Sequence, residues 1–299
     1  MDKLSDIRDY IPKNVWDAIK SLYDGERINE IRFRLMSPVL ITVENRTFHL
    51  KDRHGNVVIG DKVVFDYIVN KLSGGSLYSV NENIKQGFVT LPGGHRVGVC
   101  GSAVCDEGGI RHIKNVSSLC FRVCREVVGC SEEIIEEVNC GSKVYNTLIA
   151  SPPGCGKTTL LRDLCRVLGS GYAKCGIKCI GVADERSEIA SINKGVACFD
   201  VGDATFICDG YAKTYAMNLM LRTMSPDVIV CDEIGSKEDF NAVRACLKCG
   251  VNIIATAHAT DFNDLSDRFG EDIRCFEKII FLKNRGEVFK VCRRSRGDY

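Results

Sequence analysis

Residues 151–159, SPPGCGKTT, have the residue types and the spacing of a phosphate-binding loop. Such a loop turns several backbone N–H groups toward an anion, and it needs small residues where the chain curls tightly against phosphate. Gly154 and Gly156 meet that need. Lys157 follows where its ammonium group reaches the outer phosphates of a nucleotide, and Thr158 offers a hydroxyl group to magnesium. The pattern therefore indicates binding of a nucleotide together with Mg²⁺.

The loop departs from the strict signature, GxxxxGK[ST], at its first position, where Ser151 replaces a glycine. Serine suits the exit of a strand if its backbone angles are ordinary, because the two inner glycines make the closest approach to phosphate. The alternative is a glycine-rich turn that only happens to precede Lys-Thr. The loop joins an apolar strand to an amphipathic helix, as phosphate binding requires, and this context favours the loop. The residues predicted to bind the nucleotide are Ser151, Pro152, Pro153, Gly154, Cys155, Gly156, Lys157, Thr158 and Thr159.

A second motif, PDVIVCDEIG at residues 226–235, places two carboxylates at the end of a short apolar strand. Doubly wound sheets hold their ligands at this end of their strands. Phosphoryl transfer asks the protein mainly for positioning and charge neutralisation. We therefore predict that Asp232 and Thr158 hold Mg²⁺ and that Glu233 polarises the attacking water. The alternative is an acidic cap of the next helix, which the accompanying phosphate loop disfavours.

Two more motifs end strands of the same kind. In GVADERSEIA, residues 181–190, Asp184 and Glu185 could contact the metal or the water, or they could be solvated charges that start a helix. In ATAHAT, His258 could donate to the γ-phosphate or to the water, although a histidine at a strand end is more often structural. We predict Glu185 and His258 as catalytic residues beside Glu233.

The pattern of apolar residues, and with it the predicted secondary structure, changes along the chain. From about residue 139 onward, short strands that are apolar throughout alternate with amphipathic helices, which predicts a mostly parallel sheet covered on both faces. Residues 1–138 instead mix helices with alternating strands, including a helix at 61–73 and a hairpin within 86–104. We predict an α/β fold with two domains, a smaller α+β domain at 1–138 and a nucleotide-binding domain at 139–299.

Composition narrows the class of protein. Forty basic and 39 acidic side chains leave no global charge that would attract nucleic acid or anionic lipid. Seventeen cysteines without an apolar signal segment at the start of the chain predict a reducing, cytoplasmic location. CLKC at 246–249 has no second cysteine pair at zinc-site spacing, so no zinc is expected and the cysteines are interpreted as small buried hydrophobes. No stretch approaches the ~20 apolar residues of a membrane span.

The four motifs, in their order and in their residues, resemble those of the secretion-ATPase branch of the RecA-like superfamily. This branch includes type II and type IV secretion and pilus-motor ATPases. Within that branch the chain is more similar to the stage III sporulation protein AA family. The shared sequence segments span nearly the whole chain: INEIRFRLMSPVLI, GHRVGVCGSAV, LLRDLCR, DERSEIA, LRTMSPDVIVCDEIG and ATAHA. The resemblance implies a RecA-like P-loop core after the α+β domain, Mg-dependent ATP hydrolysis, and a catalytic role for Arg222.

The same resemblance implies a homo-oligomer, a hexamer, in the mother-cell cytoplasm of a spore-forming bacterium. The ring would be peripheral at the outer forespore membrane and would energise or assemble a channel complex of membrane proteins between mother cell and forespore. In such rings, arginines of the N-terminal domain reach bound nucleotide, where a guanidinium neutralises charge as the γ-phosphate leaves. The candidate arginine sensors are Arg32, Arg34, Arg96, Arg111 and Arg122.

Two other functions stay open at the level of sequence. A nucleic-acid-associated ATPase is disfavoured, because no basic stripe interleaved with aromatic residues is present. A nucleotide-gated scaffold would bind ATP and hydrolyse it negligibly. Its motifs would be those of an ATPase, so only turnover measurements separate the two.

Overall fold

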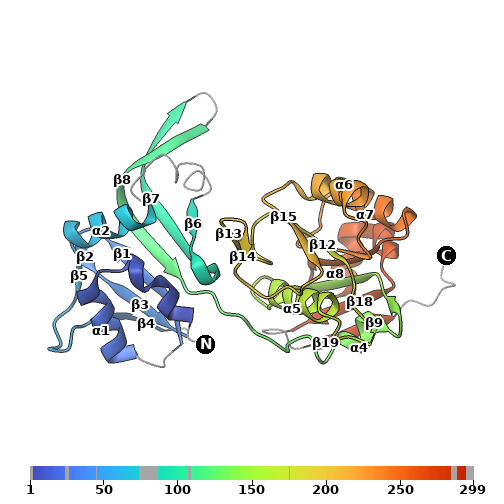
Figure 1. The fold of residues 1–299 in the computed structure, drawn as a ribbon, viewed down its shortest axis with the longest axis horizontal. Coiled ribbons are helices and arrows are strands. Elements are labelled where there is room, and N and C mark those ends of the chain that lie inside the picture. The colour runs from blue at the N-terminus through green and yellow to red at the C-terminus, as the bar shows by residue number, and fades with distance from the viewer. Residues whose placement is uncertain are drawn as a thin grey trace. The chain divides into compact units, whose positions relative to one another are not determined.

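The computed structural model divides into two compact units, Met1–Arg125 and Glu126–Tyr299, called here the N-terminal and C-terminal units (Figure 1). The residues that it describes are 3–23, 27–44, 46–73, 87–106, 109–174, 176–283 and 288–293. Within the described residues, no helix is both long enough and apolar enough to cross a membrane.

The N-terminal unit is built on a six-stranded antiparallel sheet in the order β4-β3-β1-β8-β7-β6. Along β1 the buried Ile31 and Phe33 alternate with the exposed Arg32 and Arg34, so one face of the strand joins the core and the other carries arginines. The strands are β1 Ile28–Arg34, β3 Leu40–Val43, β4 Arg46–His49, β6 Phe88–Thr90, β7 Arg96–Asp106 and β8 Gly109–Arg122. A separate two-stranded sheet pairs β2 Ser37–Pro38 with β5 Ile59–Gly60.

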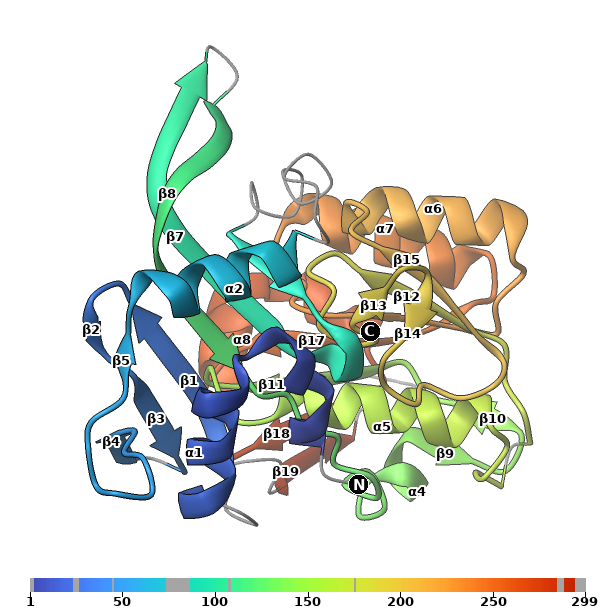
Figure 2. The same cartoon turned by 60° about the vertical axis from the view of Figure 1, so that its left-hand side comes forward.

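Helices cover the apolar side of this sheet (Figure 2). They are η1 Lys3–Tyr10, α1 Lys13–Tyr23 and α2 Lys62–Leu72, and η2 Pro92–Gly94 turns the hairpin between β6 and β7. The predicted helix at 61–73 and the predicted hairpin are thereby confirmed. Asp61 caps α2, because its carboxylate accepts the Val64 N–H at 2.9 Å.

The C-terminal unit contains a seven-stranded sheet in the order β15-β12-β16-β17-β11-β18-β19. All neighbours pair in parallel except β18 and β19, which are antiparallel, so the predicted mostly parallel sheet is confirmed. The strands are β11 Thr147–Ser151, β12 Ile180–Asp184, β15 Thr205–Asp209, β16 Val228–Cys231, β17 Asn252–His258, β18 Lys278–Leu282 and β19 Val288–Arg293. Two small hairpins lie outside this sheet, β9 Asn139–Cys140 with β10 Lys143–Val144 and β13 Ile192–Asn193 with β14 Val196–Ala197.

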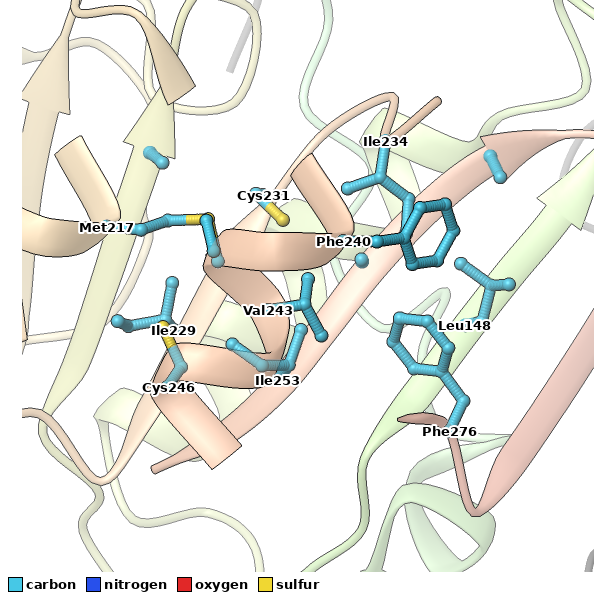
Figure 3. Packing of buried hydrophobic residues seen from close by; sticks show 14 of the residues in the cluster. Leu148, Met217, Ile229, Cys231, Ile234, Phe240, Val243, Cys246, Ile253 and Phe276 are labelled. Atoms are coloured by element: carbon cyan, nitrogen blue, oxygen red, sulfur yellow. The ribbon is translucent and has the colours of Figure 1, made fainter. Parts of the chain in front are cut away.

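Helices cover both faces of the sheet (Figure 1). On one face α5 packs through Leu160, Leu161 and Leu164, and on the other α7 packs through Phe240 and Val243. Figure 3 shows the second of these layers, where α7 lies against strand residues such as Ile229 and Ile253. The helices are α4 Ile135–Val138, α5 Lys157–Gly169, α6 Lys213–Thr223, α7 Lys237–Lys248, α8 Phe262–Phe269 and η3 Gly270–Cys275. Strands covered on both sides must be apolar throughout, which is the pattern that predicted them.

The boundary between the units lies thirteen residues before the sequence-based one, since residues 126–138 group with the C-terminal unit. Asp163 of α5 holds this segment and is only 2% exposed. Its carboxylate accepts the Gly129 N–H at 3.1 Å and both the N–H and the hydroxyl of Ser131 at 2.8 and 2.7 Å. Arg166 donates to it at 2.7 Å. Burial raises the pKa of Asp163, but these hydrogen bonds together outweigh burial and hold its pKa below the usual value.

Asp163→Ala should lower the free energy of unfolding by about 2–4 kcal/mol at neutral pH, because it leaves buried donors and Arg166 without their acceptor. A group with a lowered folded-state pKa stabilises fully above its unfolded pKa, about 4 for aspartate, and loses this effect as pH falls through the folded pKa. Thermal unfolding followed by circular dichroism should therefore show a smaller gap between wild type and variant at pH 3 than at pH 7.

The exposed Asp267 of α8 provides a control, and Asp267→Ala should stay within roughly 0.5 kcal/mol of wild type. An Asp163→Ala chain as stable as the Asp267→Ala chain would show that the carboxylate does not anchor residues 126–138.

Candidate functional site

The loop between β11 and α5 has the backbone of an anion cradle. Gly154 and Gly156 take positive φ angles of 76° and 91°, which favour glycine. The first bond within α5 runs from the Leu160 N–H to the Gly156 carbonyl, so the N–H groups of Lys157, Thr158 and Thr159 have no acceptor inside the helix. A β-carbon added at Gly154 would meet no atom within 4 Å, so the positive φ angle rather than a lack of space favours glycine there. These features fit a phosphate group at the helix N-terminus.

Lys157 is folded back over this loop and is only 6% exposed. Its Nζ donates to the carbonyl oxygens of Ser151 and Pro152 at 3.0 and 3.1 Å, and it lies 3.2 Å from the Ser151 hydroxyl oxygen. Burial lowers the pKa of Lys157, an effect that the nearby negative charges of Asp232 and Glu233 oppose. A phosphate dianion would add to that opposing effect and favour the charged amine. Ser151, which departs from the strict signature, thus helps to hold the loop lysine.

Two oxygen-bearing side chains meet where the sequence predicts magnesium. The Thr158 hydroxyl donates to Asp232 Oδ2 at 2.7 Å. The Thr256 hydroxyl donates to Asp232 Oδ1 and accepts the Glu233 N–H at 2.8 Å. Carboxylate and hydroxyl oxygens are ligands of the kind that Mg²⁺ prefers. Thr158 and Asp232 therefore fit the metal, with Thr256 fixing the orientation of the carboxylate.

Glu233 follows β16 in a left-handed conformation, with a φ angle of 50°. Lys213, at the start of α6, donates to the Glu233 carbonyl at 2.6 Å and is 7% exposed. The same ammonium lies 3.7 Å from Glu185 and 3.8 Å from Asp239. A non-glycine residue with positive φ needs such support, since the conformation costs free energy.

His258 joins Glu233 to the loop lysine. Its Nδ1 lies 3.0 Å from Lys157 Nζ, and its Nε2 lies 2.9 Å from Glu233 Oε1. A lysine ammonium only donates, so Nδ1 accepts and the proton of a neutral ring sits on Nε2, from which it donates to Glu233. The second carboxylate oxygen of Glu233 lies 2.5 Å from an Arg186 guanidinium nitrogen.

The residues of the GVADERSEIA motif divide between two environments. Glu185 is exposed, with its carboxylate near Lys213. Asp184 is 1% exposed, and its carboxylate accepts the backbone N–H groups of residues 188–190 at 2.7 to 3.2 Å. Burial raises the pKa of Asp184 despite these hydrogen bonds. Asp184 therefore shapes the loop after β12, and the expectation that it contacts metal or water does not hold in this geometry.

Arg222 is not brought to the loop within the chain. It is exposed in the last turn of α6, the end that leads to the start of β16, whereas Asp232 follows the end of that strand. The Cys179 thiol lies 3.8 Å from the Met224 carbonyl oxygen, which places the end of α6 near the start of β12. Arg222 thus lies near the amino ends of the strands, whereas the phosphate loop lies at their carboxyl ends.

The remaining predicted residues have clear positions. Pro152 and Pro153 lie in the turn after β11, and Thr159 lies in the first turn of α5. Cys155 is 9% exposed, and its Sγ donates to the Lys283 carbonyl at 3.2 Å.

In the N-terminal unit, a cavity of about 520 Å³ is lined by four of the candidate sensors, Arg32, Arg34, Arg96 and Arg122. The side chain of the fifth, Arg111, lies outside the described residues.

Three residues of the site were missed by sequence reasoning: Arg186, Lys213 and Thr256. Arg186 and Thr256 lie inside motifs whose carboxylates and histidine carry the predictions. Lys213 carried no signal, because its contact with Glu233 joins segments twenty residues apart.

Solved structures with this fold include ATPases of secretion and pilus systems. The pilus retraction motor PilT, determined with bound ADP, matches with a TM-score of 0.62 at 13% identity, over 93% of this chain and 83% of that one. The ATPase DotB of Yersinia pseudotuberculosis matches with a TM-score of 0.60 at 15% identity, over 89% and 74% of the two chains. These likenesses confirm the predicted fold class, a RecA-like P-loop core with a mostly parallel sheet, preceded by a smaller α+β domain.

Sequence comparison assigns the family. The family described as "Sporulation stage III, protein AA" matches residues 3–295. Stage III sporulation protein AA of Bacillus subtilis (strain 168) is 33% identical over 267 residues, which are 89% of this chain and 85% of that protein. The chain belongs to the stage III sporulation protein AA family, as its motifs predict.

Thr256→Val should lower the free energy of unfolding by about 1–3 kcal/mol, because it removes the hydroxyl that links Asp232 to the Glu233 N–H in a buried position. Thr256→Ser keeps the hydroxyl and loses one methyl group, which costs about 1 kcal/mol. Chemical denaturation of both variants measures the difference. A valine variant no less stable than the serine variant would contradict a structural role for the hydroxyl.

Proposed function

We propose that this chain is a Mg²⁺-dependent ATPase of the secretion type that acts in sporulation. The observation that carries the proposal is the convergence of Lys157, Thr158, Asp232 and Glu233 at one edge of the parallel sheet, with His258 joining Lys157 to Glu233. Each of these residues supplies a group that phosphoryl transfer from ATP to water requires.

The roles follow from the side chains. The backbone N–H groups at the start of α5 and the ammonium of Lys157 would bind the phosphates, and Thr158 and Asp232 would hold the metal. Mg²⁺, when bound, would neutralise charge on the phosphate oxygens. Glu233 would orient the attacking water and accept its proton, and His258 would position the Glu233 carboxylate. Glu185, beside Lys213, is a second acidic group at the same edge.

We further propose a hexamer that works with membrane proteins of a channel complex at the outer forespore membrane, on the cytoplasmic side of the mother cell. Membership of a sporulation family supports the setting, and the likeness to a pilus motor supports a ring that performs mechanical work. In that ring, the arginines gathered in the N-terminal cavity would reach a nucleotide bound by a neighbouring subunit. Arg222, which is remote from its own loop, would act in a contact between subunits.

Lys157→Ala should abolish Mg²⁺-dependent ATP turnover by removing the cation that binds the phosphates. Glu233→Gln should lower turnover by about 10²–10⁴-fold and still bind ATP, because it removes only the base. Phosphate release and fluorescent-nucleotide binding measure the two effects. Equal turnover in wild type and Glu233→Gln would overturn the assignment of the base.

No turnover by wild type in any oligomeric state, with ATP binding retained, would favour the nucleotide-gated scaffold. Stimulation of turnover by single-stranded nucleic acid, lost at high salt, would favour the nucleic-acid-associated ATPase.

A mixing experiment tests whether the N-terminal arginines act between subunits. A chain with Arg32, Arg34, Arg96 and Arg122 changed to alanine should be inactive alone, as should Lys157→Ala. In equal mixture, about one quarter of ring interfaces would combine an intact loop with intact arginines, so about one quarter of wild-type turnover should return. A mixture as inactive as its parts would contradict action between subunits.

A further inference from the structure

Arg186 is the first of four side chains that meet in a row at the phosphate-binding edge of the sheet. Its guanidinium lies 2.5 Å from Glu233 Oε2. Glu233 meets His258, and His258 meets Lys157, so the row runs along the ends of β12, β16, β17 and β11, which are neighbours in the sheet. The first member thus touches the proposed base, and the last member is the loop lysine.

Every polar atom of Glu233 has a partner in this arrangement. Its N–H donates to Thr256, and its carbonyl accepts from Lys213. One carboxylate oxygen is next to His258 and the other is next to Arg186. A carboxylate engaged by a guanidinium on one oxygen and an imidazole on the other is a poor acceptor for a proton from water. The proposed base can act only after one of these contacts opens.

Arg186 is the partner placed to leave. Its side chain is 66% exposed, against 27% for that of Glu233, so water competes for the arginine end of the pair and weakens it. The backbone that follows it is held, since Asp184 accepts the N–H groups of residues 188–190. Arg162, on the phosphate-loop helix, donates to the carbonyls of Ile189 and Glu188 at 2.6 and 2.7 Å. The backbone beside Arg186 is therefore fixed, and the exposed guanidinium is the part of this residue that a bound phosphate can reach.

We propose that Arg186 is the residue by which the chain distinguishes a nucleoside triphosphate from a diphosphate. It pairs with Glu233 in the geometry described, and a terminal phosphate at the loop would draw the guanidinium away, because a phosphate dianion carries more charge than a carboxylate and binds a guanidinium more strongly. The transfer would free Glu233 Oε2 for the attacking water and place a positive charge beside the phosphate. This inference rests on the proposed nucleotide site, and it assigns Arg186 of the same chain a role apart from the N-terminal arginines.

Binding of AMP-PNP and of ADP, each with Mg²⁺, tests the proposal without relying on turnover. In Arg186→Gln, affinity for AMP-PNP should fall about tenfold while affinity for ADP stays within about twofold, since one charge-assisted contact to the terminal phosphate is lost. In Glu233→Gln, the guanidinium loses its carboxylate partner, so affinity for AMP-PNP should rise several-fold. The double variant should bind AMP-PNP as weakly as Arg186→Gln does, because the gain acts through Arg186.

Arg274→Gln provides a matched control. Arg274 is exposed and paired with Glu271, and it precedes the start of β18, away from the phosphate-binding edge. This variant should bind both nucleotides as wild type does, and circular dichroism should show all the variants folded.

An unchanged ratio of AMP-PNP to ADP affinity in Arg186→Gln overturns the proposal, whether both affinities stay the same or both fall equally. A gain in Glu233→Gln that persists in the double variant overturns the transfer of the guanidinium. Wild-type protein that binds nucleotide but does not turn it over would contradict the proposed ATPase and leave the role of Arg186 intact. Wild-type protein that binds neither nucleotide would overturn the nucleotide site and the Arg186 proposal together.

Discussion

The row Arg186–Glu233–His258–Lys157 depends on one constraint, the adjacency of four parallel strands whose carboxyl ends share an edge. Each strand is covered on both faces by helices, so its direction and register are set by apolar packing over its whole length. The polar residues that follow the strands are brought together by that packing, although they are far apart in sequence. The apolar layer shown in Figure 3 therefore helps to position the site.

The row also couples phosphate binding to the proposed base. Lys157 contacts carbonyl oxygens of its own loop and His258, and burial lowers its pKa. A phosphate that binds the Lys157 ammonium would draw it from His258 and so alter the contact of His258 with Glu233. Departure of Arg186 would alter the position of Glu233 from the other side. Phosphate binding would then coincide with the release of Glu233 from its contacts. This coupling would prevent hydrolysis of ATP until the nucleotide is correctly bound.

The sequence predicts the parts of this site that lie in continuous segments. The strand–loop–helix of residues 147–169 and the strand that ends at Cys231 follow from apolar runs and glycines, and both are confirmed. Strand order is a matter of pairing between distant segments, so the contact between Arg186 and Glu233 had no local signal. Arg222 illustrates a second limit of sequence-based prediction. It is close in sequence to the strand that ends at Cys231, but it lies near the start of that strand, at the opposite end from the site.

A structure of the chain with Mg²⁺ and AMP-PNP tests the central claim most directly. The account predicts that Lys157 Nζ moves from the Ser151 and Pro152 carbonyls to phosphate oxygens, that Thr158 and Asp232 surround the metal, and that Glu233 Oε2 faces the space before the terminal phosphate. Nucleotide bound elsewhere, with the contacts of Lys157 to Ser151, Pro152 and His258 unchanged, would contradict it.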